Sequence, residues 1–589
     1  MAIDEELSAL SLGKETTQVP VCATCQSPAN LACKGCLLVT YCGTECQKAH
    51  WAIHKSDCRC PLSKDDWQLS WVVQNRSPAF TGNSDGLVAF GGKKYFWGNV
   101  PAYDVVKLER NEAAMYQGKL QLLFAASGDV RNIITSISSL PSTYKRSIHV
   151  TSNDLDFDVV ARNIIILLIA LIVEDDGTAV DCMLHIWYSA ALRQAHLDIL
   201  TLRIRPFIED VTQKVASKPA GSLLGKTWTL GSHTIRVELT KQQWDALLLF
   251  FDIPPGLTPA LAKQARDAVV SAPSRLDYRE RHMVMLQPSH RLCFAKFRED
   301  GILLPFGKSR DRYSVPNPTF CQSTSWPMKD DAEPTAGWDL EDIINTSAGP
   351  AKNDFYGKLF VLISQKLYAF RQKLATQVFD FRLTNVNAIE LSDASGGNSY
   401  ARIEVQRSSY PYSDSTNDSK VSNISDGGYL GIKRTVEKFG PMLQHPKKNP
   451  HATLITLFMN ATHEINAQRS DHEARALMTL QTRRIAKYMT FGPMDLHSPC
   501  GPPVIKMMMA QELVKNVDQD FEQYMKWTNF KEVEQSGRLE VKKENTIIEK
   551  WPMKLKLKPG QKGAKEEFDL LLSSSHTGQE RYVEWKVKQ

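Results

Sequence analysis

The chain has 589 residues and a net charge of +6, with 42% hydrophobic and 23% charged residues. This length is too great for one core and predicts several domains. The small net charge argues against a dedicated nucleic-acid-binding protein, which usually concentrates Lys and Arg on one face. The most apolar run, 164–173, would rise about 15 Å as a helix, half of what a bilayer requires. We therefore expect a buried core helix there, and neither a membrane nor a nucleic acid as a partner.

Residues 1–20 are acidic and lack the basic and apolar regions of a secretory signal, so we expect a flexible tail. Eight of the twelve cysteines lie between Cys22 and Cys60, together with two histidines. Cysteines clustered with histidines at short spacing are typical of a metal site in a reducing compartment. The sequence therefore predicts a cytoplasmic protein, with the nucleus as the alternative location.

Residues 21–60 contain the spacing C-x2-C-x7-C-x2-C-x5-C-x3-C-x7-H-x3-C. Each C-x2-C pair is a usual way to present two thiolates to one zinc ion. Cys46 and His54 fall on a predicted helix, where they are about 12 Å apart along the axis. Because the donor atoms on one zinc lie within about 4 Å of each other, these two residues cannot share an ion. The spacing therefore predicts two zinc ions with these eight ligands: Cys22, Cys25, Cys33, Cys36, Cys42, Cys46, His54 and Cys58.

The eight ligands fill both coordination spheres, which predicts structural rather than catalytic zinc. Helix geometry pairs Cys42 with Cys46 and His54 with Cys58, but it does not say which C-x2-C pair joins which. A segment of this length buries too little apolar surface to fold alone. Zinc binding, with roughly 10 to 16 kcal/mol in small fingers, would supply the missing stability. Two donors are left over: we expect His50 to pack against the finger and Cys60 to be a free thiol.

This segment resembles a MYND zinc finger. The features that carry the resemblance are Tyr41-Cys42, Cys46-Gln47, His50-Trp51 and the final His54-x3-Cys58. The cross-brace of the family implies that the first and third Cys pairs share one ion, and that the second pair shares the other ion with His54 and Cys58. MYND fingers dock short proline-containing peptides of partner proteins, and the resemblance implies that role here. The two net positive charges of residues 21–60 are few for binding DNA.

Beyond the finger, the sequence alternates between strand and helix patterns. Residues 120–126 form a short apolar run typical of a buried strand, and Ser127-Gly128-Asp129 turns the chain into an amphipathic helix. The next strand ends in Asp154, and a second helix carries the apolar run. Three further strands are predicted at 378–383, 401–405 and 451–460. This alternation predicts a parallel sheet with helices on both faces.

We therefore predict an α/β fold: a small two-zinc cross-brace finger, then a Rossmann-like, mostly parallel sheet with a large helical insertion, then C-terminal helices. The expected boundaries are a tail at 1–20, the finger at 21–60, a linker at 61–85, a Rossmann-like domain at 86–462 with its insertion at about 175–375, and a C-terminal helical segment with a basic tail at 463–589.

The glycine turn and the acidic strand end resemble those of a class I methyltransferase. In that family the turn lets the backbone approach S-adenosylmethionine, and the acidic residue binds the ribose hydroxyls. The resemblance implies that Gly128, Asp129 and Asp154 are the candidates for binding a cofactor. The turn has one glycine where the family has several, and a polar insertion separates Val405 from Ser422. A Rossmann-like sheet without a cofactor is therefore the favoured interpretation.

A second resemblance runs from about residue 95 to about residue 460. It is to the uncharacterised domain that follows MYND fingers in many fungal proteins, related to the front domain of an axonemal dynein assembly factor. That family has no established activity. The segments that carry the resemblance are YFWGNVPAYDVV, LLFAASGDVRNII, DVVARNIIILLIAL, LLPFG, VPNPTF, WPMKD and NPHATLITLFMN.

The rest of the chain offers little catalytic chemistry. It contains no G-x-S-x-G elbow, Walker A motif or H-E-x-x-H motif, and nothing that resembles a SET domain. Cys182 and His185 are surrounded by apolar residues and are expected to be packed side chains. We therefore predict an adaptor or scaffold protein without catalytic residues, whose finger recruits a protein partner. The alternative is an S-adenosylmethionine-dependent methyltransferase whose finger selects the substrate.

Overall fold

The computed structural model describes residues 20–81, 90–113, 115–391, 399–406, 424–427, 430–489, 492, 500–574 and 576–588. Of the tail predicted at 1–20, residues 1–19 lie outside this part of the chain. The chain forms two compact units. Unit 1 comprises Met1–Trp97, Ile164–Ser222 and Thr240–Gln372, and unit 2 comprises Gly98–Asn163, Leu223–Leu239 and Lys373–Gln589.

Unit 1 contains the finger and a set of helices. In the finger, β1 (Leu31–Ala32) pairs antiparallel with β2 (Thr40–Tyr41), and helix α2 (Thr44–Cys58) follows. A second two-stranded sheet pairs β5 (Ala191–Leu192) with β8 (Val315–Pro316). The other helices of this unit are α3 (Ser70–Val73), α7 (Asp176–Tyr188), α8 (Gln194–Asp198), α9 (Arg205–Lys214), α10 (Lys241–Leu248), α11 (Pro259–Val270), α12 (Leu276–Met283), α13 (Pro288–Asp300) and α14 (Leu340–Asn345).

Two long helices have residues in both units: α6 (Phe157–Ile172) and α15 (Phe355–Thr376). Residues 164–172 of the apolar run predicted to form a core helix lie in α6, and residues 164–170 are buried, as expected. None of the helices in the described part of the chain is both long enough and apolar enough to span a membrane. Short 3₁₀ and π turns occur at η1 (Pro61–Ser63), η2 (Ile199–Ile204), η3 (Leu249–Phe251), η4 (Pro273–Arg275) and η5 (Pro334–Gly337).

Unit 2 is built on a nine-stranded sheet. The five predicted strands lie next to one another at its centre and are parallel. This confirms the prediction of a mostly parallel sheet in a mixed α/β protein. The order across the sheet is β12 (Leu539–Val541), β13 (Arg581–Val587), β11 (Thr453–Phe458), β10 (Arg402–Val405), β3 (Leu120–Phe124), β4 (Ile148–Asn153), β9 (Phe379–Thr384), β7 (His233–Thr240) and β6 (Leu223–Leu230).

Apolar side chains of the central strands pack against helices on the sheet, with Leu123, Ile403, Leu454 and Trp585 in one buried cluster. The helices of unit 2 are α4 (Leu108–Asn111), α5 (Arg131–Ser138), α16 (Gly431–Phe439), α17 (Ala461–Asn466), α18 (Asp471–Ile485), α19 (Pro502–Ala510), α20 (Val517–Trp527), α21 (Phe530–Ser536) and α22 (Ala564–Leu572), with 3₁₀ turns η6 (Gly440–Met442) and η8 (Glu512–Val514).

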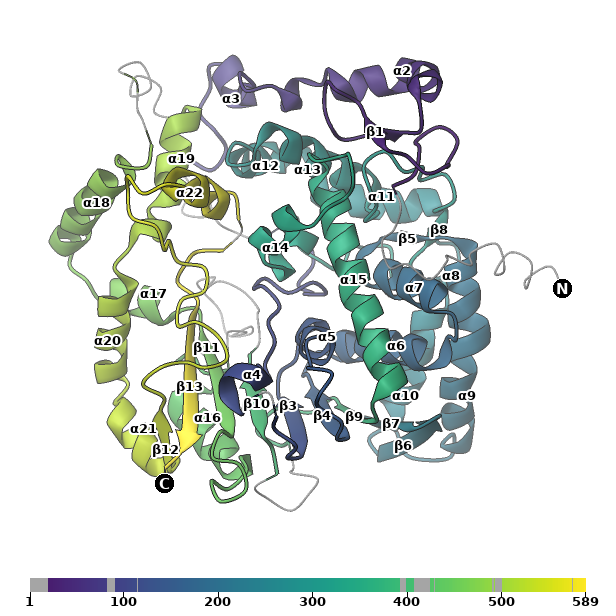
Figure 1. Cartoon of the computed structure of the whole chain (residues 1–589), viewed down its shortest axis with the longest axis vertical. Coiled ribbons are helices and arrows are strands. Elements are labelled where there is room, and N and C mark those ends of the chain that lie inside the picture. The colour runs from purple at the N-terminus through teal and green to yellow at the C-terminus, as the bar shows by residue number, and fades with distance from the viewer. Residues whose placement is uncertain are drawn as a thin grey trace. The chain divides into compact units, whose positions relative to one another are not determined.

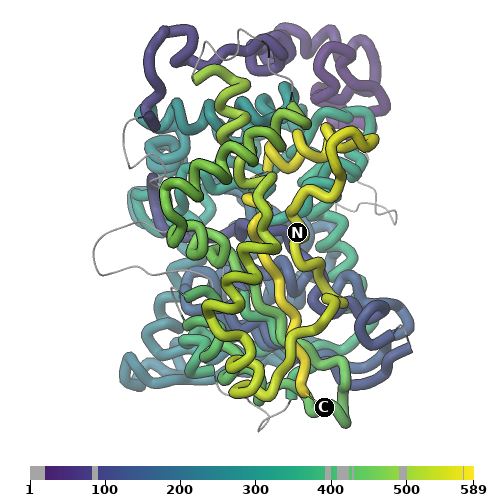
Figure 2. Tube along the Cα trace, turned by 90° about the vertical axis from the view of Figure 1, so that its left-hand side faces the viewer, coloured from purple at the N-terminus to yellow at the C-terminus, as the bar shows by residue number. Residues whose placement is uncertain are grey.

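Four strands of the sheet lie outside the five predicted strands. The segment predicted as a helical insertion contains β6 and β7, and β7 pairs parallel with β9. The segment predicted as C-terminal helices with a basic tail contains β12 and β13. Strand β13 pairs antiparallel with β11, and the yellow β13 lies beside the green β11 in both views (Figures 1 and 2). The C-terminal segment is therefore part of the sheet as well as helical.

The physical reasons differ between the two missed pairs. Strand β6 is an edge strand with mostly exposed or half-buried side chains, so it lacks the apolar run of a buried strand. Strand β13 carries the charged residue Glu584 in the interior, where its carboxylate lies 2.9 Å from the Lys542 ammonium. The same carboxylate accepts hydrogen bonds from the backbone N–H groups of Thr546 and Ile547. Because the partners of Glu584 lie far from it in the sequence, the sequence alone suggests that this charged residue is on the surface.

Candidate metal centre

Two tight turns place the first and second Cys pairs. In each turn the backbone N–H of the residue after the second cysteine donates to the carbonyl of the first: Gln26 to Cys22 at 3.0 Å and Leu37 to Cys33 at 2.8 Å. Both Gln26 and Leu37 have positive φ, which non-glycine residues adopt rarely. The strained turns bring two thiols of each pair to one side of the chain, as a shared metal ion requires.

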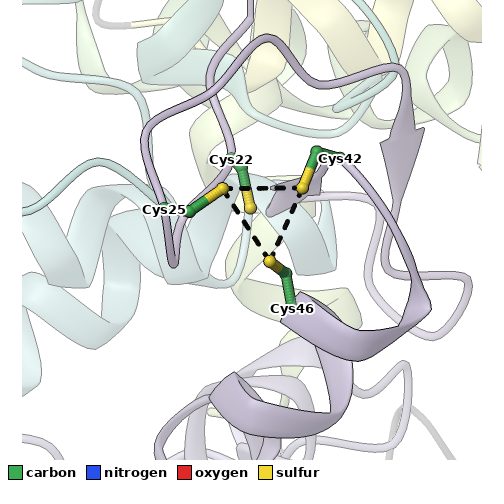
Figure 3. A group of neighbouring side chains, drawn as sticks. All are labelled: Cys22, Cys25, Cys42 and Cys46. Carbon is green, nitrogen blue, oxygen red and sulfur yellow. Dashed lines mark hydrogen bonds between the residues drawn. The ribbon is translucent and has the colours of Figure 1, made fainter.

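Four cysteines converge to form the first cluster. Cys22 and Cys25 come from the first turn, Cys42 follows β2, and Cys46 lies in the first turn of α2 (Figure 3). The Sγ atoms of Cys25, Cys42 and Cys46 are separated by 3.5, 3.5 and 3.8 Å, and all four Sγ atoms lie within 4.8 Å of one another. Thiolates around one tetrahedral zinc are about 3.8 Å apart, because each Zn–S bond is about 2.3 Å. The cluster therefore has the size of a zinc site with four cysteine ligands.

The second cluster combines Cys33 and Cys36 of the second turn with His54 and Cys58 of α2. The Sγ atoms of Cys33 and Cys58 are 3.8 Å apart, and the Sγ of Cys36 lies 3.3 Å from Nε2 of His54. Gly35 leaves room for this approach, since a Cβ there would lie 2.9 Å from the Sγ of Cys58. The structure thus resolves the pairing that helix spacing left open. The Cys22–Cys25 pair joins Cys42 and Cys46, and the Cys33–Cys36 pair joins His54 and Cys58.

Charge and burial in the clusters suit a divalent cation. Burial opposes ionisation of Cys22, but backbone N–H groups of Cys25 and Cys42 outweigh it and lower the pKa of this thiol to about 6. Burial raises the pKa of Cys36. Burial also lowers the pKa of His54, which keeps its imidazole neutral, the form that binds metal. A metal ion would compensate the buried thiolates that water cannot solvate.

The two surplus donors lie outside both clusters. His50 packs as predicted: its Nδ1 lies 3.0 Å from the hydroxyl of Tyr41, and its ring stacks on that of His54 with a centroid distance of 5.8 Å. Cys60 is a free, half-buried thiol just after α2. Nδ1 of His54 is buried and has no hydrogen-bond partner within the described residues.

The finger is attached to the helices of unit 1 by its second turn. Asn353, in the loop before α15, donates from Nδ2 to the carbonyl of Cys36 at 2.9 Å and from its backbone N–H to the carbonyl of Leu37 at 3.1 Å. Gly307 also lies close to the finger, because a Cβ at this position would lie 2.8 Å from Cγ1 of Val39. No sequence pattern pointed to Asn353, which lies more than 300 residues after Cys36 in the chain.

The segment predicted as a linker at 61–85 is also attached where the structure describes it. The Asp277 carboxylate accepts two hydrogen bonds from the guanidinium of Arg76, at 2.6 and 2.7 Å, and one from the backbone N–H of Ala79. The side chain of Trp71 in α3 is buried. These contacts, together with those of Asn353, attach the finger to the helices of unit 1 at its second turn and through the segment that follows it.

The three candidate cofactor residues lie together at the carboxyl ends of β3 and β4. The backbone N–H of Gly128 donates to the Asp154 carboxylate at 2.9 Å, and Gly128 has a φ of +57°. The Asp129 carboxylate lies 2.6 Å from Nε of Arg131. Asp154 is 1% exposed. The structure therefore brings these residues together. Both carboxylates already have protein partners: Asp154 accepts from Gly128, and Asp129 pairs with Arg131.

The pair Cys182 and His185 is packed, as expected. Both side chains are fully buried in α7. His185 is hydrogen-bonded through Nδ1 to the hydroxyl of Ser189 at 2.9 Å and through Nε2 to that of Tyr313 at 3.0 Å. These contacts give the imidazole a structural role in the interior of unit 1.

Comparison with known proteins identifies two families in separate parts of the chain. A model of the MYND finger matches residues 22–58, and a model described as a domain of unknown function, DUF4470, matches residues 96–192. No curated protein and no solved structure matches the chain. Of the seven segments that carried the resemblance to a fungal domain, the DUF4470 match covers the second and third in full and the first from Phe96 onward. The protein therefore contains a MYND finger, with two clusters that fit two structural zinc ions, followed by a DUF4470 domain.

Proposed function

We propose that the finger is a zinc-stabilised module that docks a peptide of a partner protein, and that the chain acts as an adaptor or scaffold. The observation that carries this proposal is that the two clusters consist entirely of protein donors. No coordination position is then left for a substrate or a catalytic water. MYND fingers generally bind protein partners. The proposed zinc ligands are Cys22, Cys25, Cys42 and Cys46 for one ion, and Cys33, Cys36, His54 and Cys58 for the other.

The exposed face of α2 supports a docking surface. Only His54 of its fifteen residues is buried. Gln47 and Trp51 are one turn apart on the same side of the helix, and both are half-buried. The Trp51 ring packs edge-on against His54 at a centroid distance of 6.1 Å, which fixes its orientation. Proline-rich segments dock on such aromatic surfaces, so we propose a proline-containing peptide as the ligand.

Peptide binding tests this proposal. The full-length, zinc-loaded protein is titrated with an array of proline-containing peptides, and the best peptide is carried forward to the variants. Trp51→Ala is expected to weaken its binding by about thirtyfold, the size of an interface hot spot. Ile53→Ala is the matched control, because this side chain is 70% exposed and points away from Trp51 on the helix. Zinc content of both variants should equal that of the wild type.

Two results would contradict the docking proposal. One is that no peptide of the array binds the zinc-loaded protein. The other is that Ile53→Ala weakens binding as much as Trp51→Ala, since the effect would then not come from the face that carries Gln47 and Trp51.

A second candidate function, an S-adenosylmethionine-dependent methyltransferase, is favoured by the strand order. Numbered along the chain, the five central strands β9-β4-β3-β10-β11 follow the order 3-2-1-4-5 of a doubly wound Rossmann-like sheet. In such sheets ligands bind outside the carboxyl ends of the strands where the order reverses, here between β3 and β10. We rank this function second, because a fold does not determine an activity and the Asp154 carboxylate already accepts the Gly128 N–H.

Calorimetric titration with S-adenosylmethionine separates the two functions. A saturable signal that Gly128→Val abolishes would support the enzyme, because valine cannot adopt the positive φ of this turn without strain. Absence of heat and of a thermal shift would remove the methyltransferase. The predicted relationship to a dynein assembly factor and the predicted cytoplasmic location stay predictions.

A further inference from the structure

A cavity of about 420 Å³ lies in unit 1 between the finger and the helices. The finger contributes Val21, Pro28, Leu38 and Thr40 to its wall, and the opposite wall comes from α7, α8, α15, the loop after α13 and the loop before α15. The volume is within the range of small-molecule sites, which are mostly apolar with a few placed polar groups. Because the finger forms one wall, the shape of this cavity depends on the folded finger.

The two carboxylates that line the cavity are already used by donors of the protein. Asp181 accepts hydrogen bonds from the guanidinium of Arg193 and from Nε2 of His196, the latter at 2.7 Å. Asp354 accepts from the backbone N–H groups of Gly357 at 2.8 Å and Phe306 at 2.7 Å. Among the described residues, neither acid forms an ion pair with a further cation in the wall.

Lys308 is that further cation. Its Nζ lies 5.7 Å from the centre of the Phe360 ring, and it has no carboxylate partner or hydrogen-bond acceptor among the described residues. Burial, together with the nearby guanidinium groups of Arg193 and Arg310, lowers the pKa of Lys308 to about 8. A protonated ammonium with cationic neighbours and no counter-ion favours an anion brought from outside.

We propose that this cavity binds a small organic acid, whose carboxylate pairs with Lys308 and whose apolar body packs against the prolines and aliphatic residues of the wall. A single unpaired ammonium matches a single carboxylate, whereas a phosphate calls for several donors. The apolar wall residues, such as Pro28, Leu38 and Val361, match a hydrocarbon body. This inference does not depend on the docking of a peptide by α2.

The test is a calorimetric titration of the full-length, zinc-loaded protein with octanoate, with octylammonium and with inorganic phosphate as probes. Octanoate is expected to bind saturably at one site, and the other two probes are not. Lys308→Met keeps the apolar stem and removes the charge, so octanoate should bind at least tenfold more weakly. Lys308→Arg should retain binding. The matched control is Lys218→Met, which removes an exposed lysine that does not line the cavity.

A second variant keeps the proposal testable if Lys308→Met does not fold. Ala348→Phe fills the cavity without changing its charge and should weaken octanoate binding at least tenfold. The proposal is overturned if octanoate gives no saturable heat, if octylammonium or phosphate binds as tightly, or if neither Lys308→Met nor Ala348→Phe weakens octanoate. Chelation of zinc should abolish octanoate binding, because the finger wall is then lost.

Discussion

Helix α2 of the finger has fifteen residues, of which only His54 is buried, whereas all six residues of strand β11 in unit 2 are buried. The sheet can therefore be stabilised by removal of apolar side chains from water. The finger has no comparable interior, and its two clusters of cysteine and histidine take the place of a core. The finger therefore depends on metal ligands and the sheet on buried apolar side chains, so each part can be disrupted without the other.

Removal of zinc should cause the largest loss of structure, and this loss should be confined to the finger. We expect a chelator to unfold residues 21–60, because zinc contributes roughly 10 to 16 kcal/mol in small fingers. Hydrogen exchange measured by mass spectrometry checks this prediction. Amides of α2 should lose protection, while those of β3 and β11 keep it. If α2 keeps its protection without zinc, the finger does not depend on the metal for its stability.

Loss of a buried ion pair should destabilise unit 2 and leave the finger and its zinc ions intact. The Arg402 guanidinium pairs with the Glu112 carboxylate, and both side chains are at most 1% exposed. Arg402→Met leaves Glu112 without its cationic partner and should destabilise unit 2 by about 3 to 5 kcal/mol. Protection of β3 and β10 from hydrogen exchange should fall, with zinc content unchanged. Adding Glu112→Leu should restore part of the stability; no recovery would mean that the lost hydrogen bonds of Arg402 to backbone carbonyls or its lost packing, and not the charge of Glu112, explain the loss.

Asn353→Ala tests the attachment of the finger to unit 1. The substitution removes the hydrogen bond to the Cys36 carbonyl, and the expected loss is about 1 kcal/mol. Because Cys36 belongs to the second cluster, one of the two zinc ions should be released faster to a chromogenic chelator, and the other at the wild-type rate. Asn345→Ala, at an exposed position of α14, is the control. Equal acceleration of both ions would show that the contact is not local.

His50→Phe should cost as little stability as Asn353→Ala and should leave both zinc ions in place. It removes the hydrogen bond with Tyr41 but keeps a ring beside His54, so we expect a loss of about 1 kcal/mol and no change in zinc content. Metal analysis and thermal denaturation of the variant check this. Loss of one ion would identify His50 as a ligand.

The finger was predictable because its chemistry is local. Cys46 and His54 lie on one short helix, and rise per residue alone shows that they cannot share an ion. The parallel strands were predictable because 120–124 and 453–458 are apolar runs. Contacts between distant parts of the chain were not predictable. Asn353 and Cys36 have no shared sequence signal, Glu584 in β13 looks like a surface charge, and the unpaired state of Lys308 depends on the folded loops.

The finger is assigned two zinc ions, one held by Cys22, Cys25, Cys42 and Cys46 and the other by Cys33, Cys36, His54 and Cys58. The decisive test of this assignment is the zinc stoichiometry. Elemental analysis of the purified wild-type protein should give two zinc atoms per chain. Cys46→Ala breaks only the first cluster, and Cys36→Ala breaks only the second, so each variant should retain one zinc atom. A wild-type value of one, or a Cys46→Ala variant that still holds two, would contradict the assignment.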